Sequence, residues 1–361
     1  MKNMNRDVAV WCSLLIFVAT LAAGEQNTGK RGHFLTPREL AELGDKSKVS
    51  YATTIVKSSA DLPNFRHPGF PKDGSLPETP YPEISAGSDG SRSLFSYRPS
   101  AIASKALEEA EPLFQSKKYA QALPIYREAS LKDPKCYVLY MSMGDCYLFS
   151  GNALAALDNY DKAIALNPND YHGHWFRASA LVELDKPEEA SHSYARALAM
   201  SPRNPSLLKA INTRSSRLGI RAREELFHPQ ATARPEGEKF VIYTVEGLHW
   251  WLYGLCKALW LAEEGHRMDL TGSTDHGWTN TEELECMGNL LASYRTDREE
   301  GKGAPEPELD LLLEVLNSGN LGGFVNYEFG SQFSHDYAIL LDTESQEKLS
   351  RFVEQYVFQK Q

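Results

Sequence analysis

Small, aromatic and proline residues in the middle of the chain recur with a spacing of 34 residues. Between them, apolar residues follow the 3.6-residue period of an α-helix, and a spacing of this length is typical of stacked helix–turn–helix repeats. The pattern predicts three repeats at residues 103–136, 137–170 and 171–204, and a capping helix at 205–218. The recurring residues are Ala122, Ala156 and Ala190; Tyr126, Tyr160 and Tyr194; Ala129, Ala163 and Ala197; and Pro134, Pro168 and Pro202.

These positions resemble the tetratricopeptide repeat (TPR) family. Gly144 supplies a small residue in the first helix of the second repeat, where the second helix can approach closely, and Asn167-Pro168 closes that repeat. His174 departs from the family pattern, which usually has a bulky aromatic residue there. The resemblance covers residues 101–219, and it implies an α-helical solenoid that binds another protein or a peptide in a concave groove.

The same resemblance assigns the groove to the first helix of each repeat. Its surface is apolar and mildly acidic, and it lacks the Lys/Asn/Arg set with which some relatives clamp an acidic peptide's terminal carboxylate. Such a surface suits a helix or an extended aliphatic segment of a partner. The alternative is that the chain's own N-terminal or C-terminal segments fill the groove. The candidate binding residues are Leu107, Phe114, Val138, Met141, Asp145, Leu148, Phe149, His172, Trp175, Ser179 and Val182.

Residues 236–361 do not show the 34-residue spacing. Apolar runs at 239–245, 324–329 and 337–341 predict three strands. Helical periodicity predicts four helices between and after them, so we expect a small α+β domain of unidentified family behind the solenoid. The predicted helices cover residues 248–262, 279–294, 310–316 and 343–357.

The N-terminal region has two different compositions. Lys2 and Arg6 precede an apolar stretch and then small residues, which predicts a signal peptide at residues 1–24 and an extracytoplasmic protein, periplasmic or secreted. Membrane association is expected only in the alternative that this segment stays uncleaved as an anchor. Residues 25–99 are rich in Pro, Ser and Gly and are predicted to be a disordered linker, the alternative being an extended strap across another surface.

Net charge and cysteine content bear on the class of partner and on the redox state of the protein. The net charge of −10, without a Lys/Arg run longer than two residues, argues against a nucleic-acid binder. Cys256 and Cys286 lie on two predicted helices of the C-terminal domain. They are either a disulfide in an exported protein or, as we favour, two buried thiols.

Catalytic signatures are absent from the sequence. No HExxH, CxxC, GxSxG or P-loop motif occurs, so we expect no metal, no cofactor and no catalytic residue. The chain is therefore predicted to be an exported, non-enzymatic adaptor or scaffold that binds a protein or peptide, with a structural component of an envelope assembly as a further possibility. The rival hypothesis is an enzyme of unknown class in the C-terminal domain, around His249, Asp275, His276, His335 and Asp336.

Overall fold

The chain forms two compact units that alternate along the sequence. The computed structural model describes residues 32–64, 79–88, 91–275, 277–330, 332, 334 and 336–361, so the predicted signal peptide lies outside the described residues. Unit 1 combines the described parts of residues 1–75 with 226–326, and unit 2 combines those of 76–225 with 327–361. Each unit is therefore built from two separate stretches of chain. Among the described residues, no helix is both long and apolar enough to cross a membrane.

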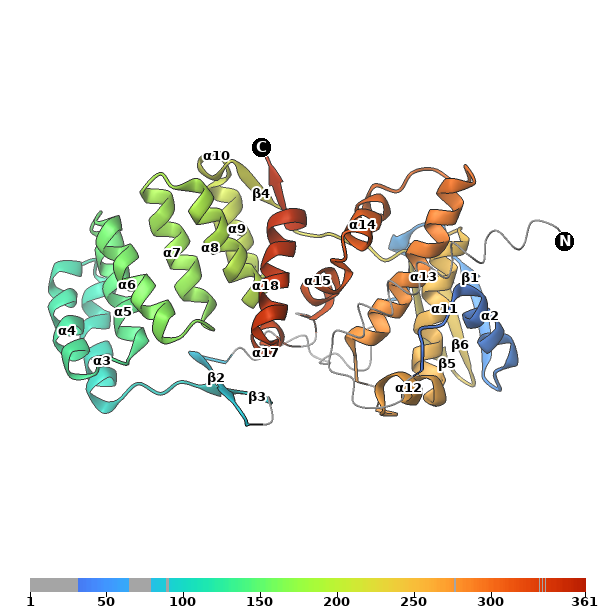
Figure 1. Cartoon of the computed structure of the whole chain (residues 1–361), viewed down its shortest axis with the longest axis horizontal. Coiled ribbons are helices and arrows are strands. Elements are labelled where there is room, and N and C mark those ends of the chain that lie inside the picture. The colour runs from blue at the N-terminus through green and yellow to red at the C-terminus, as the bar shows by residue number, and fades with distance from the viewer. Residues whose placement is uncertain are drawn as a thin grey trace. The chain divides into compact units, whose positions relative to one another are not determined.

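Unit 2 contains three pairs of antiparallel helices where the three repeats are predicted (Figure 1). The recurring alanines and tyrosines are buried between the helices, with Tyr160 and Tyr194 fully inaccessible to solvent. A Cβ atom on Gly144 would lie only 2.4 Å from the ring of Tyr160, so the small residue sets the approach of the two helices. The helices are α3 (Ala101–Gln115), α4 (Tyr119–Lys132), α5 (Tyr137–Phe149), α6 (Ala153–Leu166), α7 (Tyr171–Glu183) and α8 (Pro187–Met200).

The array ends in a cap that is made from two distant stretches. The predicted capping helix is divided at Arg214 into α9 (Pro205–Thr213) and α10 (Ser215–Leu218). The C-terminal helix α18 (Thr343–Phe352) packs against α8 and continues into a π-helical turn, η3 (Val353–Val357). Strand β7 (Phe358–Lys360) then pairs antiparallel with β4 (Ile220–Ala222). The helix predicted at 343–357 therefore covers the repeat array and is not part of a separate C-terminal domain.

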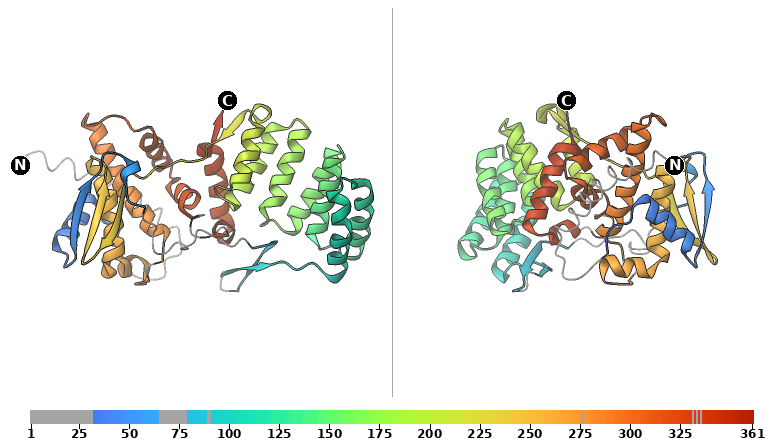
Figure 2. Two further views of the ribbon diagram at one scale, coloured as in Figure 1. Left: turned by 180° about the vertical axis from the view of Figure 1, so that it is seen from behind. Right: turned by 45° about the vertical axis from the view of Figure 1, so that its right-hand side comes forward.

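Unit 1 is a three-stranded sheet with helices. The strand order is β1-β6-β5, where β1 (Ser50–Ile55) runs parallel to β6 (Lys239–Thr244) and β5 (Ala231–Glu236) runs antiparallel to it. Figure 2 shows β1 in blue beside the two yellow strands. A Cβ atom on Gly254 would lie 2.6 Å from Ile242, so a glycine lets the helix that covers the sheet approach β6 closely. The helices are α2 (Pro37–Lys46), α11 (Leu248–Ala262), α12 (Glu264–Thr271), α13 (Asn280–Glu299), α14 (Pro307–Asn317) and α15 (Leu321–Val325).

The prediction that residues 25–99 are disordered is wrong for much of the described part. That region contains α2, β1, a 3₁₀ turn η1 (Ser59–Asp61), and a hairpin of β2 (Pro82–Ala86) and β3 (Arg92–Ser96). The reason is that these elements are stabilised by distant residues. For example, the Tyr51 hydroxyl donates to Glu263 at 2.6 Å, and such long-range pairing is not visible in local composition.

The prediction of strands is also wrong for two of the three C-terminal segments. Residues 324–329 belong to α15 and the π-helical turn η2 (Asn326–Gly330), and residues 337–340 form the short helix α17 (Tyr337–Leu340). Residues 324–329 are buried whether apolar, as Phe324 and Val325 are, or polar, as Asn326 and Glu328 are. A short apolar run of this kind has no periodicity that separates a strand from a buried helix.

Candidate functional site

The predicted groove residues all lie on α3, α5 and α7, and we call this surface the first-helix face. Its residues differ in exposure. Val138, Met141 and Val182 are buried, whereas Phe149 is 60% exposed. The remaining members, which are half-buried, are Leu107, Phe114, Asp145, Leu148, His172, Trp175 and Ser179.

One group of aromatic rings joins the first and second repeats. The rings of Phe114 and Phe149 meet edge to face with centroids 5.8 Å apart. Tyr119, at the start of α4, stacks on Phe149 at 5.7 Å and contacts Phe114 at 5.3 Å. These distances are typical of favourable aromatic pairs, so the exposed Phe149 is held in place on its inner side and available on its outer side.

A second group of rings lies on α7. The rings of Tyr171, His172 and Trp175 stack on one another, with the His172 centroid 4.0 Å from that of Tyr171 and 6.2 Å from that of Trp175. Phe176 contacts Trp175 at 5.7 Å and reaches Tyr160 of the second repeat at 5.9 Å. The first-helix face therefore presents aromatic surface on both sides of α5.

Asp145 is the acidic residue at the middle of this face. Its carboxylate accepts a 2.7 Å hydrogen bond from the Tyr160 hydroxyl. The pKa of Asp145 is raised to about 7, because burial and, to a smaller extent, the Glu111 carboxylate on α3 outweigh the Tyr160 hydrogen bond and the charge of His172, which lower it. A carboxyl group on this face therefore changes charge close to neutral pH.

The β2–β3 hairpin and the residue that follows it, Tyr97, contact the second repeat. The Asn167 side chain donates to the Pro82 carbonyl at 2.7 Å, and the rings of Tyr97 and Tyr137 have centroids 5.1 Å apart. The hairpin thus touches the first residue of α5 and the turn before α7. The alternative of an extended strap across another surface describes this segment better than a disordered linker does.

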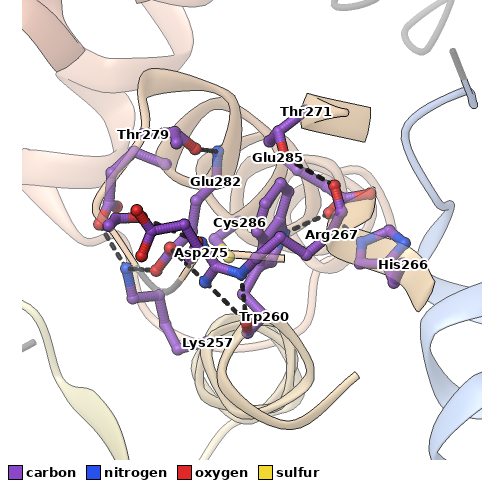
Figure 3. Close-up of polar contacts among 12 residues, drawn as sticks. Lys257, Trp260, His266, Arg267, Thr271, Asp275, Thr279, Glu282, Glu285 and Cys286 are labelled. Atoms are coloured by element: carbon purple, nitrogen blue, oxygen red, sulfur yellow. Dashed lines mark hydrogen bonds and ion pairs between the residues drawn. The ribbon is translucent and has the colours of Figure 1, made fainter. Parts of the chain in front are cut away.

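Unit 1 contains a cluster of buried charges that was not predicted from the sequence. Lys257 of α11 is hydrogen-bonded to both Glu282 and Glu283 of α13, at 2.5 Å for Glu282. Arg267 of α12 lies 3.6 Å from the other oxygen of Glu282. Figure 3 shows Lys257 and Arg267 around Glu282. Glu282, Glu283 and Arg267 are each at most 2% exposed. The sequence signal was a set of acidic residues inside an otherwise apolar helix.

A further buried carboxylate extends this cluster. Glu285 accepts hydrogen bonds from the Trp260 indole at 2.6 Å, from His266 at 2.8 Å and from the backbone nitrogen of Leu35 at 2.6 Å.

The pKa of Lys257 is raised to about 12. Burial alone would lower this pKa, but the charges of Glu282 and Glu283 outweigh the effect of burial. Lys257 therefore stays protonated near neutral pH and is not suited to act as a base or nucleophile.

The two helices of the cluster are also joined covalently. Cys256 and Cys286 form a disulfide between α11 and α13, with Cα atoms 5.3 Å apart. The favoured prediction of two buried thiols is therefore wrong, because packing places the two cysteines within bonding distance across the helix pair. Cys136 and Cys146 of the repeats are buried free thiols.

The described residues of the rival enzyme hypothesis are divided between the two units. His249 forms ion pairs with Asp297 at 3.2 Å and Glu306 at 2.8 Å. Burial alone would lower its pKa, but these carboxylates raise it. Asp336 belongs to unit 2, where it accepts from Thr79, whereas His249 and Asp275 belong to unit 1.

Two of the five candidate residues cannot be placed in either unit from the described part of the chain. The candidates His276 and His335 lie outside the described residues. Within the part of the chain that the structure describes, no group of three or more His, Cys, Asp and Glu side chains could hold a metal ion.

Comparisons with known proteins concern the repeat segment. Residues 137–170 match the tetratricopeptide repeat family model. Protein unc-45 homolog B of Xenopus tropicalis is 32% identical over 122 residues, which make up 33% of this chain and 13% of that protein. Hsp70-Hsp90 organizing protein 1 of Glycine max is 28% identical over 142 residues, or 38% of this chain and 25% of that protein. The chain therefore spans a quarter or less of the length of these relatives.

Solved structures match the same third of the chain. The first TPR of Spaghetti (RPAP3), bound to an HSP90 peptide, is 27% identical with a TM-score of 0.32, and the match covers 33% of this chain and 95% of that one. The Yersinia enterocolitica type III secretion chaperone SycD, in complex with a peptide of the translocator YopD, is 18% identical with a TM-score of 0.30, covering 33% and 92%.

Proposed function

We propose that this protein is a non-enzymatic adaptor that binds a partner protein through the first-helix face. The proposal is supported by the match of residues 137–170 to the tetratricopeptide repeat family model and by the three helix pairs from α3 to α8. The observation that carries the proposal is the pair of aromatic groups on that face, with Phe149 60% exposed. Exposed aromatic rings that are already held by their neighbours lose little side-chain entropy on binding and are enriched at protein interfaces.

The test is a charge substitution on the face with a matched control. We expect Phe149→Glu and Trp175→Glu to abolish recovery of the partner when the tagged full chain is cross-linked and purified from its native host. Leu154→Glu is the control, because Leu154 is 62% exposed but lies on α6, outside the face. Equal partner recovery with all three variants would remove the first-helix face from the mechanism.

We further propose that the protein is exported. The signal-peptide pattern at residues 1–24 supports this location, as does the Cys256–Cys286 disulfide, since disulfides persist mainly in oxidising compartments. Protein isolated from its native compartment under acid quench should show Cys136 and Cys146 as its free thiols outside residues 1–31 after denaturation and alkylation. Alkylation of Cys256 and Cys286 as well would contradict export.

A further inference from the structure

The acidic and aromatic residues of the first-helix face occur together. Glu111 precedes Phe114 by three positions on α3, and Asp145 precedes Phe149 by four positions on α5. Residues at these spacings are neighbours on a helix surface. Because the rings of Phe114 and Phe149 are in contact at 5.8 Å, the two carboxylates lie on adjoining helices beside one aromatic surface.

Neither of these two carboxylates is paired with a lysine or arginine among the described residues. Helix α5 contains no lysine or arginine, and Arg177 of α7 is engaged with Asp161 at 2.6 Å. The third acidic residue near the face, Glu183, is paired with Arg217 at 2.9 Å. In the part of the chain that the structure describes, Glu111 accepts from Gln115 and Asp145 accepts from Tyr160, with the His172 imidazole as the basic group that acts on Asp145. The face therefore presents two carboxylates without a lysine or arginine partner.

We propose that the partner segment is apolar and carries a lysine or arginine whose charged end binds between Glu111 and Asp145. This inference rests on the proposed function. The aliphatic stem of such a side chain can lie along Phe114 and Phe149, while its charged end reaches the carboxylates. A partner with an acidic end would instead be repelled, because like charges brought together at an interface oppose binding.

The pH dependence of binding offers an independent readout. The groups facing Asp145 are Tyr160 on α6, His172 on α7 and Glu111 on α3. Since the pKa of Asp145 is about 7, affinity for a cationic peptide should rise between pH 6 and pH 8 as Asp145 loses its proton. The Asp145→Asn variant does not titrate at this position, so it separates the contribution of Asp145 from that of the other groups on the face.

The experiment is selection of random 12-residue peptides displayed on phage against the immobilised full chain. We expect the enriched peptides to contain lysine or arginine flanked by apolar residues. A synthetic peptide of the enriched sequence should bind E111Q/D145N at least about tenfold more weakly than the unsubstituted chain. The control is Glu109→Gln, which neutralises another exposed acid of α3 and should leave the affinity unchanged.

The possible failures are distinguishable. Enriched peptides that lack a cation but are released by Phe149→Glu and Trp175→Glu would overturn this inference and leave the proposed function standing. Cationic peptides that bind E111Q/D145N as tightly as the unsubstituted chain would also overturn it. Absence of any enriched peptide would overturn both this inference and binding of a linear segment by the face.

Discussion

The pKa values of two side chains in the array are shifted in opposite directions. The pKa of Asp145 is raised to about 7, mainly by burial, whereas burial lowers the pKa of His174 to about 4. His174 is buried and its ring lies 3.2 Å from the Pro168 carbonyl, to which the neutral ring donates. The position where the repeat family usually has a bulky aromatic residue is thus filled by an uncharged imidazole. The resemblance identified this departure, but only the surrounding packing shows why a histidine is tolerated.

The pH dependence of stability should reveal Asp145. Because its pKa is higher in the folded than in the unfolded chain, its stabilising contribution is complete below about pH 4 and is lost as the pH rises toward 7. Asp145→Asn does not titrate and keeps an oxygen that can accept from Tyr160. We therefore expect the melting temperature of the variant, relative to the unsubstituted chain, to increase by a few degrees between pH 4 and pH 8. A constant difference, measured by calorimetry across this range, would contradict the assignment.

At the scale of elements, the sequence predicted the helices whose packing contacts lie within one repeat and recur in the next. The alanine and tyrosine positions of the second helices face the first helices of the same repeat, so a 34-residue spacing carries the necessary information. Strand β1 pairs with β6, far along the chain, and its short sequence has no comparable signal. The buried charges of α13 were likewise missed, because their partners are on α11 and α12.

The joint between α11 and α13 should depend on charge balance. Replacing Lys257 with methionine keeps much of the side-chain volume but leaves Glu282 and Glu283 as neighbouring buried carboxylates. We expect unit 1 to lose about 3–5 kcal/mol of stability, which is typical when one partner of a buried ion pair is removed. Denaturant unfolding followed by hydrogen exchange of α11 measures this loss.

The rescue experiment distinguishes charge from packing. Adding Glu282→Gln and Glu283→Gln to Lys257→Met removes the uncompensated charges and should restore part of the lost stability. A triple variant that is no more stable than Lys257→Met would show that packing of the lysine stem, and not its charge, holds the helices together.

At the scale of the whole molecule, the division into units differs from a linear order of domains. The sequence predicted a solenoid followed by an α+β domain, because periodicity identifies elements but not which distant segments meet. In the structure, β1 completes the sheet of unit 1 and α18 covers α8 of unit 2. The sequence assigned β1 to the linker and α18 to the C-terminal domain, so neither segment was predicted in the unit to which it belongs.

This division predicts a local response to a substitution near the C-terminal end of unit 2. Phe352 of α18 is fully buried, so Phe352→Ala should cost about 3–5 kcal/mol. Hydrogen exchange should rise in α8, α18 and β4, while protection of α11 and α13 in unit 1 stays unchanged. Equal loss of protection in both units would contradict their assignment as separate compact bodies.

The pairing of β4 with β7 has a consequence for how the chain is made. Residues 226–326, which build most of unit 1, are synthesised after β4 and before β7. While the chain emerges from the ribosome, the first seven helices from α3 to α9 exist without α18, and their apolar end stays open until translation has passed through the whole intervening segment. A factor that binds nascent chains could therefore bind the unfinished array long before β7 is synthesised and pairs with β4.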